Sequence, residues 1–315
     1  MKHPPLPHSP RAWWLAARPK TLAAAWASVT TAAVMAYTSP HELHPHAPWL
    51  VVCCLLFAGL MQVASNFIND RIDYLRGTDT HERLGPERAC QQGWITPQAM
   101  QRAIVGVVGV ALLTGLAAAA IYLTHTPYPP ATLLGGLAAL GASCVAAAFL
   151  YTTVLSRWGL GDVLVVLFFG LVPVGGTFFL LTHTLTLPSL LLGLGVGLVV
   201  DTLLVVNNFR DRDTDRAAGR RTLVVLMGDR WGARLYYWMG WLGTAAFILA
   251  TLWHIQGPEN WGLLMCFYLM VHHINYRRML HINHGRALNA VLGSTAAAIM
   301  LWAVLAIAVM GMSKS

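Results

Sequence analysis

The sequence predicts an all-α polytopic membrane protein with about nine transmembrane helices in one bundle. Composition is the first reason, because 56% of the 315 residues are hydrophobic and only 11% are charged. A soluble globular domain has about 25% charged residues, so this chain lacks the polar surface that water requires. Long apolar stretches and an uneven distribution of basic residues are the second and third reasons.

Each apolar stretch is close to the ~20 residues that a helix needs to cross the hydrocarbon core. Helices are expected because lipid offers the backbone no partners, so its polar groups must be satisfied within the segment. The stretches cover residues 21–38, 48–69, 103–124, 131–151, 160–182, 187–208, 234–253, 260–276 and 287–311. Pro173 is expected to kink the fifth, with a neighbouring group satisfying the carbonyl that it frees. Glycines in the fourth and sixth, such as Gly135 and Gly193, are expected at close helix contacts.

The N-terminal segment differs from the rest of the chain. Trp13 and Trp14 precede Arg18, a composition typical of a short helix that lies in the membrane interface. We therefore expect a cytoplasmic tail with an interfacial helix over residues 1–20. A single transmembrane domain is expected over residues 21–315.

Basic residues gather on one side of the predicted topology. With a cytoplasmic N-terminus, every Lys and Arg except Lys314 lies in the N-terminal tail, in a cytoplasmic loop or at the helix ends beside one. The opposite loops carry histidines, Glu42 and Glu259 but no Lys or Arg. This asymmetry predicts a cytoplasmic N-terminus and an external C-terminus. Topology also explains the net charge of +8; no motif for nucleic acid is present, and no nucleic-acid partner is expected.

Two acidic segments interrupt the apolar pattern, each at the predicted cytoplasmic end of a helix. The first carries Asn66, Asp70 and Asp73 at i, i+4 and i+7, and the second carries Asn207, Asp211 and Asp215 at i, i+4 and i+8. Residues with this spacing share one helical face. Each helix therefore presents an amide and two carboxylates in one direction.

Carboxylates crowded in this way repel, at a cost on the order of 3 kcal/mol for a pair ~5 Å apart in an effective dielectric of ~20. A divalent cation removes that cost. Oxygen donors without His or Cys favour a hard ion such as Mg²⁺, which completes its shell with water and substrate phosphates. The expected metal ligands are Asn66, Asp70, Asp73, Asn207, Asp211 and Asp215, with Asp79 as a weaker addition.

Basic side chains beside both motifs are candidates for phosphate binding, because guanidinium groups bind phosphate in a bidentate manner. These candidates are Lys20, Arg71, Arg76, Arg88, Arg210 and Arg221. A diphosphate held at a membrane face implies a lipid diphosphate substrate. Ionisation of an allylic diphosphate leaves a carbocation, which needs a dry chamber and a nucleophile close by. The remaining charges, such as Asp213 and Asp229, are interpreted as solvated loop residues.

At these motifs the sequence resembles the UbiA superfamily of intramembrane prenyltransferases. Members carry an NDxxD-type motif after the second helix and a DxxxD-type motif after the sixth, and Asn69-Asp70-x-x-Asp73 and Asp211-x-x-x-Asp215 match them. The resemblance covers nearly the whole chain and is strongest to the 1,4-dihydroxy-2-naphthoate polyprenyltransferase branch. Further matches to that branch are Arg18-Pro19-Lys20-Thr21-Leu22, Gly85-Pro86-Glu87-Arg88 and Ala218-Gly219-Arg220-Arg221-Thr222-Leu223. Three departures are Asp162 in place of Glu, Arg220 in place of Lys, and a changed, shorter loop after Tyr151.

The resemblance implies Mg²⁺-dependent transfer of a polyprenyl group from polyprenyl diphosphate to 1,4-dihydroxy-2-naphthoate in a bacterial inner membrane. Diphosphate, carbon dioxide and a proton leave, and the product is demethylmenaquinone. The implied catalytic residues are Asp70, Asp73, Asp211 and Asp215. The implied substrate-binding residues are Lys20, Asn66, Arg88, Asn207, Asn208 and Arg221, with Tyr74 and Tyr151 facing the carbocation or the acceptor.

Two alternatives stay open at this point. One is a UbiA-type enzyme with another aromatic acceptor, such as 4-hydroxybenzoate. The other is a secondary transporter, which would place coupling charges near the bilayer midplane, whereas almost all acids here lie at helix ends. Asp201, inside the sixth apolar stretch, is the exception. An ionisable residue at that depth is a functional hypothesis by default.

Overall fold

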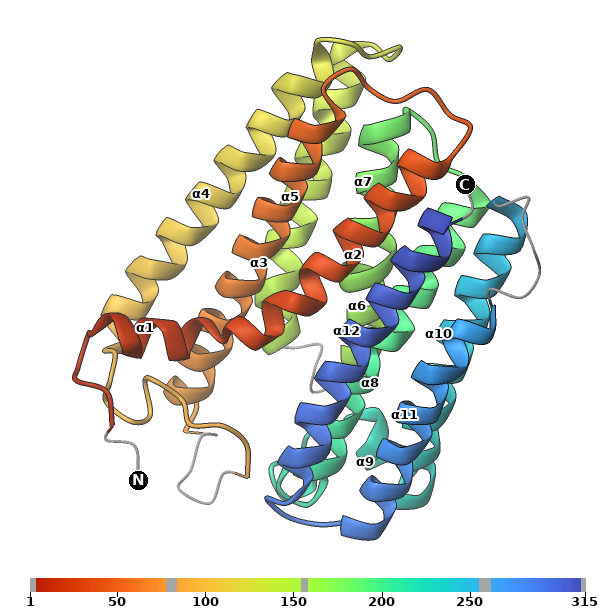
Figure 1. The fold of residues 1–315 in the computed structure, drawn as a ribbon. Coiled ribbons are helices and arrows are strands. Elements are labelled where there is room, and N and C mark those ends of the chain that lie inside the picture. Colours follow the sequence, from red (N-terminus) through yellow and green to blue (C-terminus); the bar gives the residue numbers. More distant parts are fainter. Residues whose placement is uncertain (1–3, 78–83, 154–157, 255–261, 313–315) are drawn as a thin grey trace.

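The computed structural model describes residues 4–77, 84–153, 158–254 and 262–312, and its regular elements in these ranges are all helices (Figure 1). They are α1 (Pro10–Ala17), α2 (Pro19–Thr38), α3 (Ala47–Leu75), α4 (Pro97–Leu123), α5 (Pro130–Thr153), α6 (Gly161–Val165), α7 (Val172–Thr182), α8 (Leu187–Ala217), α9 (Leu223–Met227), α10 (Asp229–His254), α11 (Gly262–Ile282) and α12 (Leu288–Met312). A π-helix, Val166–Leu171, joins α6 to α7, so that these elements form one continuous segment.

The long helical segments follow the predicted apolar stretches. In the described part of the chain, nine segments of at least 20 residues each coincide with one stretch. Seven of the nine are long and apolar enough to cross a membrane, whereas α2 and α11 are long enough but less apolar. The all-α membrane-protein architecture is therefore confirmed, and the number of nine spans stays a prediction.

The N-terminal helix α1 lies across the end of the bundle, at a steep angle to its neighbours (Figure 1). Ser9 caps it by accepting a hydrogen bond from the Ala12 N–H, and Arg18, with φ of +52°, turns the chain into α2. The Trp13 ring packs against Phe67 of α3 with ring centroids 5.7 Å apart. Trp14 is 63% exposed, as expected for a residue at a membrane interface.

The region before Pro173 is distorted in the way the sequence predicts. Proline has no N–H, so the carbonyl of Phe169 loses the partner that a regular helix would provide. The Ser28 hydroxyl of α2 donates a hydrogen bond to this carbonyl. The chain widens into the π-helix just before the proline. The expected satisfaction of the freed carbonyl by a neighbouring helix is confirmed, whereas the kink itself stays a prediction.

The central helix α8 packs backbone against backbone on its neighbours. A Cβ atom on Gly193 would lie 3.0 Å from Leu171 Cα, and one on Gly195 would lie 2.7 Å from the carbonyl oxygen of Gly243 in α10. Glycine permits this approach because it has no side chain. The expected close helix contact at Gly135 of α5 is wrong. A Cβ atom added there would have no other described part of the chain within 4 Å.

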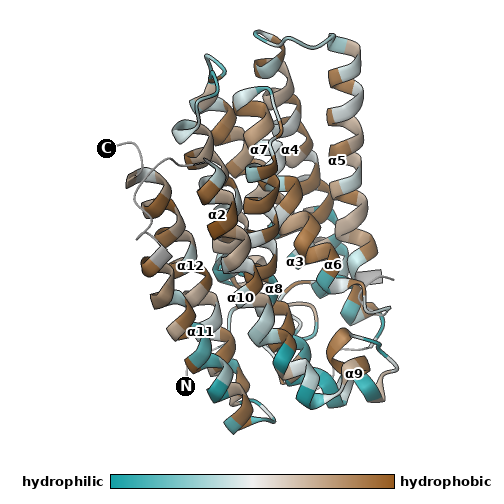
Figure 2. Ribbon diagram, turned by 90° about the vertical axis from the view of Figure 1, so that its right-hand side faces the viewer, coloured by the Kyte–Doolittle hydropathy of each residue, from teal (hydrophilic) through white to brown (hydrophobic). Residues whose placement is uncertain are grey.

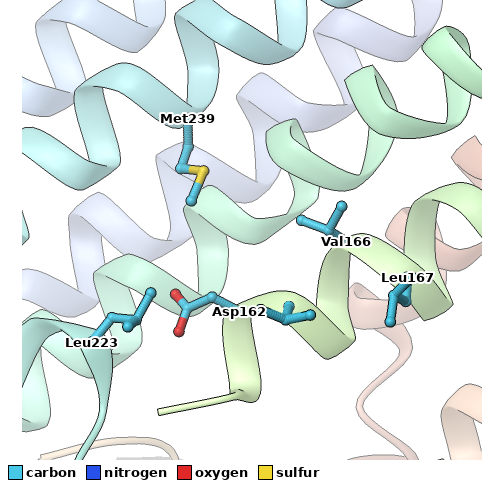
Figure 3. A pocket seen from close by; sticks show the side chains of 6 residues that line it. Asp162, Val166, Leu167, Leu223 and Met239 are labelled. Carbon is cyan, nitrogen blue, oxygen red and sulfur yellow. The ribbon is translucent and has the colours of Figure 1, made fainter.

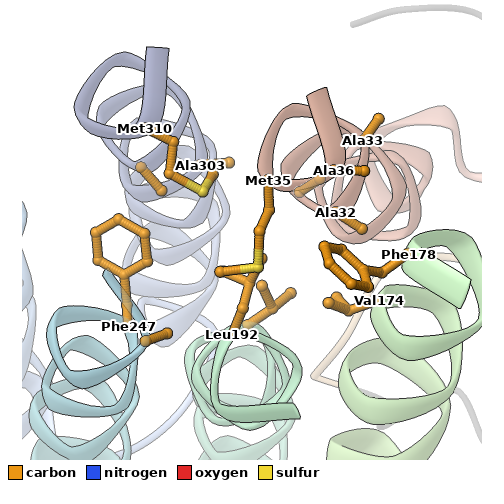
Figure 4. Packing of buried hydrophobic residues seen from close by; sticks show 14 of the residues in the cluster. Ala32, Ala33, Met35, Ala36, Val174, Phe178, Leu192, Phe247, Ala303 and Met310 are labelled. Carbon is orange, nitrogen blue, oxygen red and sulfur yellow. The ribbon is translucent and has the colours of Figure 1, made fainter. Parts of the chain in front are cut away.

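Apolar side chains fill the space between α2, α7, α8, α10 and α12. Figure 4 shows Met35 of α2 pointing toward Leu192 of α8, with Phe178 of α7 on one side and Phe247 of α10 on the other. Hydrophilic residues gather instead at one end of the bundle, where α8 ends and α9 lies (Figure 2). That end carries both acidic motifs.

Candidate functional site

The ends of α3 and α8 bring the two acidic motifs together. Arg220 lies between them, with Nη2 3.6 Å from Oδ1 of Asp73 and Nη1 3.5 Å from Oδ1 of Asp215. Asp73 and Asp215 are 8% and 7% exposed. A carboxylate from each motif therefore faces the same cation, as the sequence predicts for two motifs that share a substrate.

Arg220 reaches this position because α8 ends in a tight reversal of the chain. Gly219 has φ of +70°, and its N–H donates to the carbonyl of Arg216. The Arg220 N–H donates back to the carbonyl of Asp215 at 2.9 Å. These two bonds form a Schellman motif, which needs the left-handed conformation that glycine adopts without strain. The reversal places the Arg220 side chain beside the last acidic residue of the motif.

The first motif also organises the loop after α3. Both oxygens of Asp70 accept backbone hydrogen bonds at 2.9 Å, one from the Ala89 N–H and one from the Cys90 N–H. Arg88, the preceding residue, donates to Oδ2 of Asp73 at 3.0 Å. Each carboxylate oxygen has a second lone pair, so these contacts leave acceptor capacity for a ligand. Burial and the nearby Asp70 charge raise the pKa of the Cys90 thiol, which keeps it protonated and unreactive.

Asn66, at the start of the first motif, connects three helices. Its Nδ2 donates to the carbonyl of Ala17 at 2.8 Å and to the Thr21 hydroxyl at 2.9 Å. Its Oδ1 accepts from Gln62 at 3.3 Å. Asn66 is 4% exposed. In this structure its amide therefore positions α1 and α2 against α3, while its proposed role as a metal ligand is untested.

The second motif is held by arginines. Arg210 forms two short hydrogen bonds with Asp211, of 2.8 and 2.6 Å, and a third of 2.8 Å with Asn289 of α12. Asn289 in turn donates to the carbonyl of Leu84, before the loop that Asp70 binds. Arg212 is fully buried and pairs with Asp229 at 3.0 Å. Arg210 and Arg212 thus fix the end of α8 instead of standing free for phosphate.

The remaining sequence-predicted residues surround this centre. Asn207 and Asn208 are half-buried one turn before Asp211, and neither amide has a hydrogen-bond partner among the described residues. Lys20, Tyr74 and Arg221 are exposed, and their roles stay predictions. Asp79 lies outside the described residues.

Three further groups extend the site into the bundle. Tyr151 of α5 is half-buried and lies within electrostatic range of Asp73, Arg220, Asp162 and Asp201. Asp162 of α6 is 3% exposed and Asp201 of α8 is 0% exposed. Tyr151 is therefore near the first acidic motif and near two buried carboxyl groups.

The oxygen donors fit Mg²⁺ that is shared with a substrate. Among the described residues, no three His, Cys, Asp or Glu side chains converge as a complete metal site. Mg²⁺ usually binds through one or two carboxylates and completes its shell with water and substrate phosphates. Asp73 and Asp215 already face one cationic group, Arg220, so the site suits a cation held between two motifs.

Comparison with known families matches residues 26–303 to the UbiA prenyltransferase family. The chain belongs to this family. The 1,4-dihydroxy-2-naphthoate octaprenyltransferase of Haemophilus influenzae is 38% identical over 229 residues, or 71% of each chain. The proteins of the same name from Escherichia coli and Mycobacterium leprae are 35% and 32% identical, over 84% and 93% of each chain. This UbiA-family chain is therefore a prenyltransferase.

Solved structures support the same fold. A UbiA homologue from Aeropyrum pernix has a TM-score of 0.67 at 15% identity and covers 92% of this chain and 98% of its own. A homologue from Archaeoglobus fulgidus, bound to DMAPP and Mg²⁺, has a TM-score of 0.60 at 13% identity, with coverages of 95% and 99%. The UbiA-type helical bundle predicted from the motifs is thereby confirmed.

Sequence reasoning missed the bridging position of Arg220. It selected the neighbouring Arg221, which forms no ion pair within the described ranges. The available signal was Gly219 four residues after Asp215, because glycine just past a helix end predicts a Schellman reversal. That reversal directs the next side chain, Arg220, back toward the helix end.

Proposed function

We propose that this UbiA-family enzyme transfers a polyprenyl group from polyprenyl diphosphate to 1,4-dihydroxy-2-naphthoate, releasing diphosphate and carbon dioxide. The observation that carries the proposal is the meeting of Asp73 and Asp215 at Arg220. It provides a charged, partly buried centre at the end of an apolar bundle. The names of the relatives at 32–38% identity supply the acceptor.

The residues divide into three roles in this proposal. Asp73 and Asp215, with Asp70, Asp211 and the amides of both motifs, would hold Mg²⁺, which neutralises the diphosphate as the allylic C–O bond breaks. Arg220 and Arg88 would bind diphosphate oxygens directly, because they already lie among the carboxylates. The apolar bundle would exclude water from the carbocation. Tyr151, which lies within electrostatic range of Asp73 and Arg220, would border the reacting carbon.

Mg²⁺ binding is proposed on two grounds. One is the donor set itself, which consists of oxygen atoms on two helices. The other is the Archaeoglobus fulgidus homologue, which binds DMAPP together with Mg²⁺. We further propose that the protein spans a bacterial inner membrane with its N-terminus in the cytoplasm, because almost all basic residues then lie on the cytoplasmic side.

The test supplies purified protein in lipid nanodiscs with polyprenyl diphosphate, Mg²⁺ and one aromatic acid at a time. With 1,4-dihydroxy-2-naphthoate, mass spectrometry is expected to detect a prenylated, decarboxylated product, and chelation of Mg²⁺ is expected to abolish it. Prenylated 4-hydroxybenzoate as the main product would replace the proposed acceptor by the other aromatic acid. Absence of any prenylated product would refute the reaction itself.

A further inference from the structure

The helices that pack against α8 border an apolar cavity and also carry a chain of hydrogen bonds. The cavity, of about 220 Å³, lies between α6, the π-helix, α9 and α10 (Figure 3). Its exposed lining is apolar, although Asp162 is one of the lining residues, so it offers neither acidic motif a polar contact. The hydrogen bonds at the start of α12 differ, because they lead from one side chain toward both motifs.

The Asn289 amide forms one hydrogen bond in each direction. Its Oδ1 accepts from Nη1 of Arg210 at 2.8 Å, and its Nδ2 donates to the carbonyl of Leu84 at 2.8 Å. A guanidinium group only donates and a carbonyl only accepts, so these two partners fix which end of the amide faces which. The position therefore needs a side chain with both a donor and an acceptor. An amide meets that need, whereas a carboxylate or an aliphatic side chain does not.

Arg210 carries the contact on to the second motif. It is 3% exposed, and its guanidinium donates to both oxygens of Asp211, at 2.8 and 2.6 Å. A buried guanidinium group needs partners for its N–H groups. Asn289 is the partner of Nη1, and it thereby fixes the group that sets the direction of the Asp211 carboxylate.

Leu84 carries the contact on to the first motif. Four positions later, Arg88 donates to Asp73 at 3.0 Å, and the next two N–H groups donate to Asp70 at 2.9 Å. The first motif in α3 therefore holds this loop at residues 88–90, and α12 holds it at Leu84. The position of the Arg88 guanidinium depends on both attachments.

The start of α12 is anchored where Asn289 can reach both partners. Gly285, with φ of +82°, turns the chain after α11, and the Leu288 N–H donates to its carbonyl at 3.2 Å. Leu288 is fully buried in the same apolar cluster as Phe209 of α8. Because Arg210 follows Phe209 and Asn289 follows Leu288, the packing of this cluster brings the amide beside the guanidinium.

We propose that Asn289 is a positioning residue for prenyl transfer, which orients Asp211 through Arg210 and the Arg88 loop through Leu84 before the diphosphate binds. This assignment rests on the proposed prenyl transfer and adds α12 to the elements that form the site. Asn289 acts only through its neighbours. Without it, the substrate has to order both motifs at the expense of affinity, so binding of the diphosphate weakens while the chemical step continues.

Hydrogen exchange of the ligand-free, full-length protein in lipid nanodiscs tests the two contacts separately. Asn289→Leu removes both hydrogen bonds and is expected to speed exchange at least about fivefold in two peptides, residues 84–96 and residues 207–221. Asn289→Asp keeps the acceptor for Arg210 but loses the donor for Leu84. It is therefore expected to speed exchange in the peptide of residues 84–96 and to leave that of residues 207–221 within about twofold.

Ser294→Ala is the matched control on the same helix. Ser294 is half-buried like Asn289, and its hydroxyl donates to Oδ1 of Asn275 in α11 at 2.7 Å. The variant therefore removes one contact between α12 and a neighbouring helix at a distance from both motifs. Exchange in both peptides is expected to stay within about twofold of the wild type.

Binding and kinetics distinguish a positioning role from a general structural one. Asn289→Leu is expected to raise KM for polyprenyl diphosphate about tenfold, while kcat and KM for 1,4-dihydroxy-2-naphthoate stay within about threefold. Isothermal titration calorimetry with inorganic diphosphate and Mg²⁺ is expected to show an affinity loss of about tenfold as well, in the absence of turnover. Asn289→Asp is expected to lie between this variant and the wild type.

The outcomes separate this inference from the proposed function. An active wild type whose Asn289→Leu variant keeps its exchange rates and its affinity for Mg²⁺ and diphosphate would overturn the positioning role alone. Equal effects of Ser294→Ala would also overturn it, because they would indicate general loosening of α12. If Asn289→Leu does not fold, Asn289→Asp decides, and unchanged exchange in residues 84–96 would refute the role. A folded wild type that prenylates no naphthoate would instead overturn the proposed function.

Discussion

Asp70 in the first acidic motif is held by the backbone of a loop, whereas Asp211 in the second is held by the arginine next to it in sequence. Asp70 is 1% exposed and accepts the N–H groups of Ala89 and Cys90. The Asp211 side chain is 28% exposed and pairs with Arg210. Two motifs with similar spacing are therefore stabilised by different partners.

Both motifs contribute to one charged centre, but they differ in whether they also stabilise a loop. Each motif places one carboxylate beside Arg220: Asp73 from the first motif and Asp215 from the second. Only the first also binds a loop backbone, through Asp70 and the N–H groups of Ala89 and Cys90. Substitution of Asp70 should therefore disturb folding and chemistry together, whereas substitution of Asp215 should disturb chemistry alone.

The largest effect is expected where the motifs are equivalent. Asp73→Asn and Asp215→Asn should each lower the rate of prenyl transfer by at least about 10²-fold, because each removes a charge that holds Mg²⁺ and diphosphate. Initial rates at saturating substrates provide the measurement. Asp213→Asn is the control, since Asp213 is exposed and pairs with Arg216 at the surface. Comparable rates in all three variants would remove the basis for a shared site.

The second largest effect should distinguish the first motif from the second. Asp70→Asn should speed hydrogen exchange at the Ala89 and Cys90 amides by about 10-fold or more, because hydrogen bonds to a charged group contribute about 1.5–3 kcal/mol. Mass spectrometry of the peptide that spans residues 84–96 reports this exchange. Asp211→Asn should leave that peptide within about twofold of the wild type. Equal loosening by both variants would show that the comparison is wrong.

A smaller effect is expected for the residue between the motifs. Arg220→Gln should raise KM for polyprenyl diphosphate by about 10-fold, consistent with one lost charge-assisted contact, and Arg220→Lys should recover part of it. Steady-state kinetics at fixed Mg²⁺ measures both. Arg216→Gln serves as the control, because the Arg216 side chain is 53% exposed and, among the residues that the structure describes, pairs with Asp213 and Asp229 away from the motifs' shared cation. An unchanged KM in Arg220→Gln would exclude diphosphate binding by Arg220.

The smallest effect concerns the opposite end of the bundle, which carries histidines instead of acidic motifs. Burial lowers the pKa of His44, which stacks on Tyr122, and of His183, which hydrogen-bonds the Tyr122 hydroxyl. Unfolded histidine, with a pKa of 6.5, binds protons that these folded residues do not, so stability should fall as the pH drops below 6.5. Thermal unfolding at several pH values measures this fall.

The pH effect should be confined to that end of the molecule. His44→Gln removes one titrating group and should make the loss of stability below pH 6.5 smaller. The same variant should leave KM for polyprenyl diphosphate unchanged, because His44 is on the side away from Arg220. A changed KM would mean that the two ends are coupled.

Local patterns in the sequence predicted most of the fold. The apolar stretches coincide with the nine long helical segments of the described chain. They do so because a helix that crosses the hydrocarbon core needs a continuous run of apolar residues, which the sequence shows directly. Pro173 predicted a distortion for the same local reason. The acidic spacings predicted one-faced motifs at two helix ends, since helical periodicity is also local. The family resemblance, now confirmed, carried the reaction class.

Tertiary structure decided which side chains of those motifs meet. Composition and spacing could not show that Asp70 binds a loop backbone, or that Arg220 instead of Arg221 lies between the carboxylates. These contacts join residues from separate helices, and their distances depend on how α3 and α8 pack. Packing depends on close backbone approach at glycines such as Gly193 and Gly195, which only the assembled bundle specifies.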